Sequence, residues 1–97
     1  MSSQLEWVRL KVSVVGAEHY AINFDGSDPN HEVAPLSMVI WCENKRWRGT
    51  INKPGDARRL DFSNFPHPAN AAEAQRSAVK IARNSTALTD AQKAALP

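Results

Sequence analysis

A chain of 97 residues with 42% hydrophobic and 23% charged side chains can fold as one domain and is too short for two. Its one cysteine, Cys42, excludes an internal disulfide and a cysteine-rich zinc site, and no apolar run approaches the roughly 20 residues that cross a bilayer. We therefore expect one cytoplasmic domain over residues 1–97 without membrane contact, with any fraying confined to residues 1–4 and about 85–97.

The net charge of +2 conceals an uneven distribution along the chain. Residues 1–44 carry two basic and six acidic side chains, whereas residues 45–97 carry ten basic and four acidic ones. The densest basic region consists of Lys45, Arg46, Arg48, Lys53, Arg58 and Arg59. Two interpretations stay open, because these charges either solvate and complement one another or form separate binding poles.

Residues 70–84 give the clearest structural signal and predict an amphipathic helix. Asn70 followed by Glu73 is a capping-box-like start, with a side-chain acceptor for the first free amides and a carboxylate near the positive end of the helix dipole. Its apolar stripe consists mostly of alanine, which allows close approach to a supporting layer. The β-branched runs elsewhere indicate that this layer is a sheet.

The segment before the helix reads as a series of strands. Residues 5–15 alternate, with Val8 and Leu10 expected to face the helix and Trp7 and Arg9 to face away; residues 20–25 predict a second strand and residues 26–35 a long loop. Third and fourth strands are expected at 36–43 and 47–53, and Pro54 begins a turn before a short edge strand at 59–62.

The C-terminal segment offers Thr89 as a helix cap with Gln92 three residues later, so a short second helix either docks or frays. Together these elements predict an α+β fold. Its sheet is an antiparallel meander of four or five strands, with one main helix packed on one face and a short C-terminal helix.

A tryptophan-bearing sheet face is the first candidate interface. If Val8 faces the helix, Trp7 and the third-strand Trp41 share the opposite face, which is more apolar than a solvated face requires. The candidate partner-binding residues are Trp7, Arg9, Lys11, Trp41 and Trp47. Such a face suits dimerisation, a protein partner or base stacking. Alternatively, the tryptophans belong to the core, because the sheet curls or the terminal helix covers them.

The basic hairpin at residues 44–49, NKRWRG, is the second candidate, because a projecting turn with bases around an aromatic suits phosphate or an acidic protein surface. Strands followed by F-S-x-F and an alanine-rich helix over residues 36–84 resemble the DNA-binding domains of phage integrase amino-terminal arms and plant ethylene-response factors. That resemblance implies a sheet that enters the major groove. The proline-bearing link after Phe62 is longer than the turn expected in those domains.

Catalytic and metal-binding patterns are missing from the sequence. Residues 25–32, DGSDPNHE, lack the spacing of a calcium loop, and Asx turns explain the same residues. There is no glycine-rich phosphate loop, nucleophile elbow or paired-histidine motif, and no motif connects Cys42 to a histidine. We therefore expect no enzymatic activity, no cofactor and no metal.

These observations predict a small non-enzymatic accessory protein that binds and occludes a macromolecular partner. It is similar in general style to accessory proteins of phages and mobile elements, including anti-CRISPR inhibitors, and acts as an inhibitor or adaptor. The alternative is a nucleic-acid-binding module that uses the basic hairpin. The expected partner is a protein, with a nucleic acid or nucleoprotein complex as the alternative, and a homodimer is compatible with both functions.

Overall fold

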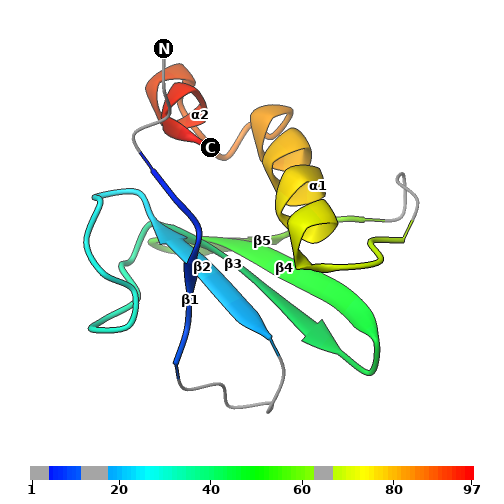
Figure 1. The fold of residues 1–97 in the computed structure, drawn as a ribbon. Coiled ribbons are helices and arrows are strands. Elements are labelled where there is room, and N and C mark those ends of the chain that lie inside the picture. The colour runs from blue at the N-terminus through cyan, green and yellow to red at the C-terminus, as the bar shows by residue number, and fades with distance from the viewer. Residues whose placement is uncertain (1–4, 12–17, 63–66) are drawn as a thin grey trace.

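The computed structural model describes residues 5–11, 18–62 and 67–97. Within them the elements are β1 (Val8–Arg9), β2 (His19–Asn23), β3 (Ser37–Glu43), β4 (Arg46–Lys53), β5 (Asp56–Arg59), α1 (Ala71–Arg83) and α2 (Asp90–Ala95). Each strand pairs antiparallel with the next, so the sheet order is β1-β2-β3-β4-β5, and both helices lie on the same side of the sheet (Figure 1). The predicted α+β meander with one main helix is confirmed.

Helix α1 begins and ends close to where its sequence predicts. The side chain of Asn70 accepts a hydrogen bond from the Glu73 amide at 2.9 Å, and the Glu73 carboxylate in turn accepts one from the Ala69 amide at 2.8 Å. The buried residues of α1 are Ala74, Ala78, Val79 and Ala82. Three of the four are alanines, so the buried side of the helix is the alanine stripe that the sequence predicts.

The hydrophobic core lies between α1 and one face of the sheet, which we call the helix face. Alternation along β2, β3 and β4 directs one set of side chains to this face. The core strand residues are Ile22, Met38, Ile40, Trp47 and Ile51, all fully or almost fully buried. The opposite face, which we call the second face, carries Trp41.

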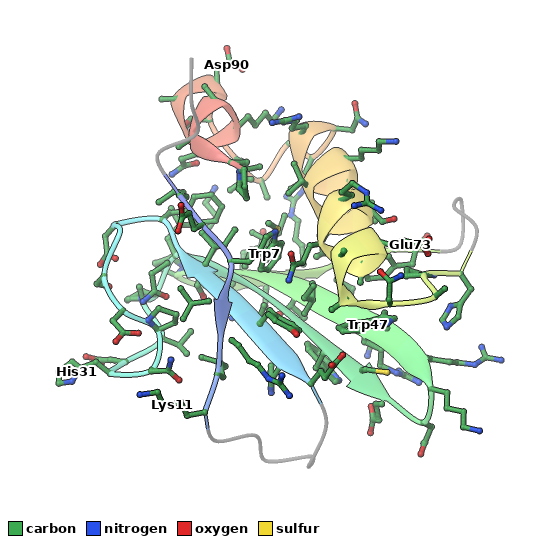
Figure 2. The ribbon with its side chains drawn as sticks, in the orientation of Figure 1. Trp7, Lys11, His31, Trp47, Glu73 and Asp90 are labelled. Carbon is green, nitrogen blue, oxygen red and sulfur yellow. The ribbon has the colours of Figure 1, made fainter. Side chains whose placement is uncertain are left out.

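The first strand has the reverse orientation to the prediction. Val8 pairs with Ala21 and therefore shares the second face, whereas Trp7 packs against the core. Figure 2 shows Trp7 on the side of the sheet where the helices lie. Near β1 both faces are covered, so the alternation of apolar side chains does not reveal which face the helix occupies. Residues 12–15 of the strand predicted at 5–15 lie outside the described residues.

The loop at residues 25–35, which we call the acidic loop, folds back against the second face. It is organised by Asn23, which is only 2% exposed, donates to the Glu32 carbonyl at 2.8 Å and accepts from the Ala34 amide at 2.9 Å. Asn30 fastens the loop to β1, because its side chain accepts from the Lys11 amide at 2.8 Å and donates to the Arg9 carbonyl at 3.1 Å. The loop thus closes the outer edge of β1.

Two tight turns fix the register of β3, β4 and β5. Asn44 and Lys45 have φ of 51° and 64°, the left-handed conformations of a type I′ hairpin turn, and Glu43 consequently pairs with Arg46. After the second turn, β5 begins at Asp56 and ends at Arg59, so the edge strand predicted at 59–62 is misplaced. Residues of that segment still pair locally, since the Leu60 amide donates to the Gly49 carbonyl at 2.9 Å.

The C-terminal segment docks on the domain, which is one of the two alternatives that its sequence leaves open. Thr89 and Gln92 form a reciprocal capping box, with hydrogen bonds of 3.2 Å and 2.7 Å. Leu96 is 1% exposed within the core, and the Ala95 carbonyl accepts from the Leu5 amide at 3.1 Å. A helix of this length is stabilised by such tertiary contacts, because it is too short to be stable alone.

Candidate binding surface around Trp41

A row of three side chains crosses the second face of the sheet. His19, Trp41 and Arg48 stand opposite one another on β2, β3 and β4. Trp41 is half-buried, and its ring centroid lies 5.8 Å from that of His19 at an interplanar angle of 46°. Burial lowers the pKa of His19 below its ordinary value of 6.5, because the charged imidazolium loses solvation there.

Arginines surround this row. Arg59 on β5 stands opposite Thr50, and Arg46 stands opposite Glu43, which places both arginines on the second face. The Arg48 Nε atom lies 3.5 Å from a Glu43 carboxylate oxygen, with the two side chains 58% and 42% exposed. In the described part of the chain, Arg46 and Arg59 form no ion pair. We define the Trp41 surface as His19, Trp41, Arg46, Arg48 and Arg59.

A groove of about 660 Å³ adjoins the Trp41 surface at the outer edge of β4. It forms where β5 ends its pairing with β4 and the chain continues as residues 60–62. The lining combines apolar groups with both charge signs: Trp41, Trp47, Gly49, Leu60 and Phe62, the polar Thr50, the cations Arg48 and Arg59, and the acids Glu43 and Asp61. A groove with this lining accepts an apolar side chain while charged groups contact its rim.

Trp7 and Trp41 do not share the second face, and the prediction that they do is wrong. Trp47 is 6% exposed, and its ring centroid lies 6.3 Å from that of Tyr20 on the helix face. Trp7 also packs on that side (Figure 2). Of the three, Trp41 alone occupies the second face. Trp47 stands opposite Cys42, the residue after Trp41, and successive residues of a strand point to opposite faces.

The remaining predicted partner-binding residues, Arg9 and Lys11, are exposed at the opposite edge of the sheet. The Lys11 amide and the Arg9 carbonyl both form hydrogen bonds with the side chain of Asn30, so the acidic loop lies beside these two residues. They do not adjoin Arg48 or Arg59, which sit on β4 and β5. The structure thus separates an acidic region near β1 from arginines near the other edge.

The predicted basic cluster divides between the two faces. Arg46, Arg48 and Arg59 lie on the second face and Lys45 lies in the turn, whereas two members have structural contacts on the helix side. Lys53 Nζ donates to the Ala87 carbonyl at 3.2 Å, and Arg58 donates to the Thr86 hydroxyl at 2.8 Å. Lys53 and Arg58 therefore hold the connection between α1 and α2, and the six bases do not form one binding surface.

Sequence reasoning missed His19, Leu60 and Phe62 as members of this region. His19 lies two residues before Ala21 on the second strand, so the two side chains share a face. The pairing of His19 with Trp41 then places His19 on the second face. No local pattern marked the groove, because it depends on where β5 stops pairing. Leu60 and Phe62 were predicted only as edge-strand residues.

Other kinds of site find little support in the described residues. Within them no group of three or more His, Cys, Asp or Glu side chains is placed to hold a metal ion. Cys42 is half-buried against the core, opposite Trp47. No helix in the described ranges has the length and apolar character needed to cross a membrane.

The chain was compared with protein-family models, curated proteins and solved structures. No protein-family model matches the chain, and neither the curated proteins nor the solved structures yield a match. The class is therefore defined by the architecture itself: an α+β domain with a five-stranded antiparallel meander and one main helix on the helix face.

Proposed function

We propose that this protein is a non-enzymatic binding protein that uses the Trp41 surface to occlude an acidic surface of another protein. One observation carries the proposal: a half-buried tryptophan stands among three arginines on the sheet face that α1 does not cover. In phage or mobile-element style, such a protein acts in the cytoplasm as an inhibitor or adaptor, in the manner of an anti-CRISPR protein.

Tryptophan and arginine are the residue types that most often dominate binding energy at protein interfaces. Covering the exposed part of Trp41, at most about a third of its side chain, contributes about 1–2 kcal/mol from apolar burial. Arg46 and Arg59 add hydrogen-bond donors that form no ion pair among the residues described. A partner that supplies carboxylates to them avoids the cost of desolvating an unpaired cation.

The distribution of charge favours a protein over a nucleic acid as the partner. A phosphate backbone requires a continuous basic track, whereas Lys53 and Arg58 face the helix side and Glu43 lies among the remaining arginines. The acidic loop, with Asp25, Asp28 and Glu32, adds repulsion toward the β1 side of the same face. A local acidic patch on a protein meets none of these obstacles.

Single-stranded nucleic acid is the second candidate, because His19 and Trp41 adjoin arginines on a sheet, and such platforms stack bases. The salt dependence of binding separates the two partners. Release of counterions from several phosphates gives a steep loss of affinity with salt, whereas a protein partner held by Trp41 retains its apolar contribution.

The proposal is tested by capture from a bacterial lysate, with nuclease-treated and untreated samples compared. The wild-type protein is compared with the Trp41→Ala/Arg48→Glu double variant and with Arg76→Glu, which reverses an exposed charge on α1. We expect a stoichiometric protein that survives nuclease, is lost in the double variant and is kept by Arg76→Glu. Unchanged capture by the folded double variant overturns the proposal. Capture that is lost on nuclease treatment also overturns it and supports nucleic acid as the partner.

A further inference from the structure

We infer that the groove beside Trp41 accepts an apolar side chain of the partner protein, flanked in the partner's sequence by carboxylates. This inference rests on the proposed function and deepens it, because it specifies the chemistry of the segment that the Trp41 surface recognises. It follows from the apolar walls of the groove, the cations at its rim and the acids that interrupt those cations.

The walls of the groove suit an apolar anchor. Leu60 is buried and Phe62 half-buried, and both pack with the core. Trp47 also lines the groove from the core side, and Trp41 forms the wall on the second face. Gly49 contributes no side chain, so Leu60 lies directly over the β4 backbone at this point. A volume of about 660 Å³ is sufficient for a large apolar side chain with part of its backbone.

The rim supplies charge complementarity to carboxylates. Arg48 and Arg59 both line the groove, and the Arg59 guanidinium has no ion-pair partner among residues 5–11, 18–62 and 67–97. A planar guanidinium binds a carboxylate through two parallel hydrogen bonds. A carboxylate next to the apolar anchor therefore reaches Arg59 without displacing Glu43 from Arg48.

The acids at the rim limit which anions fit. Glu43 and Asp61 line the same groove as the two arginines. A chain of closely spaced phosphates cannot avoid these acids, whereas a peptide presents carboxylates on alternate side chains and can direct others to solvent. The mixed rim thus favours an acidic peptide over a polyphosphate backbone.

The test uses a short synthetic peptide of aspartates around one central phenylalanine. Three matched probes accompany it: the same peptide with Phe→Gly, the same peptide with every Asp→Asn, and an oligo-thymidine. Binding is followed by the NMR shift of the Trp41 indole N–H on titration into the intact protein. We expect both altered peptides to bind at least about tenfold more weakly than the parent peptide, which corresponds to about 1.4 kcal/mol for each change.

The Arg59→Gln variant should lose most of the advantage of the acidic peptide over its Asp→Asn form, and Arg83→Gln on α1 is the matched control that should keep it. Equal binding of the Phe and Gly peptides overturns the inference, as does tighter binding of oligo-thymidine. If the acidic peptide fails while lysate capture still depends on Trp41, the inference is wrong and the proposed function stands. If capture does not depend on Trp41, the proposed function itself is wrong.

Discussion

Replacement of Gly49 by alanine tests the close approach that defines both the core edge and the groove. An added Cβ would lie 2.8 Å from Leu60 Cδ1, 2.9 Å from Ile40 Cγ2 and 2.9 Å from the Val39 carbonyl oxygen. The two side chains can shift, but the carbonyl belongs to the paired backbone of β3 and cannot move without disturbing the sheet. Overpacking of this kind costs about 1–3 kcal/mol.

For a domain of this size a loss of about 2 kcal/mol lowers the melting temperature by roughly 8–16 °C. Thermal and denaturant unfolding of Gly49→Ala measure this loss. Gly55→Ala is the matched control, because its φ of 76° is strained for alanine but nothing lies within 4 Å of its added Cβ. We expect the control to lose about 1 kcal/mol through backbone strain alone. A Gly49→Ala protein as stable as wild type would refute the packing described for Leu60.

The other predictions concern the tryptophans, the β3–β4 turn and the titration of His19. In denaturant titrations, Trp47→Ala should lower the free energy of unfolding by about 3–5 kcal/mol, because Trp47 is in the core. Trp41→Ala should lower it by less than about 1 kcal/mol, because Trp41 is outside the core. Equal losses would contradict the assigned faces. Lys45→Gly should raise stability by about 1 kcal/mol in the same assay, because φ of 64° suits glycine, and a loss would speak against the type I′ turn. The lowered pKa of His19 means that the unfolded chain binds more protons just below pH 6.5, so its contribution to stability rises with pH through that window and is lost as pH falls. Trp41→Ala should expose the imidazole and move its pKa up toward 6.5 in an NMR titration, and an unchanged or lower pKa would show that other groups bury it.

The parts of the fold that the sequence predicted are those with local causes. Asn70 and the alanine stripe identify α1, and turn residues bound the central strands, because capping and alternation act within a few residues. Trp7 was placed on the wrong face for a non-local reason. The acidic loop covers one side of β1 and the core the other, so apolar residues alternate there without indicating which side holds α1.

The binding surface was predictable only in part. Trp41 and Arg48 follow from the hairpin, because a two-residue turn at Asn44 and Lys45 determines which residues of β3 and β4 stand opposite each other. The roles of Lys53 and Arg58 depend on where the α1–α2 connection passes, and that is decided by tertiary packing. A count of basic residues along the chain therefore overstated the size of the basic surface.

The separation of the acidic loop near β1 from the arginines of β4 and β5 gives the molecule an electric dipole along the width of its sheet. In the electric field of an acidic partner, such a dipole orients the arginine-bearing edge toward the partner before contact. Approach by the edge with the acidic loop is disfavoured. Collisions are thereby selected by orientation. Added salt should consequently slow the encounter rate more than it speeds dissociation, because long-range attraction is screened while the apolar contact at Trp41 is not.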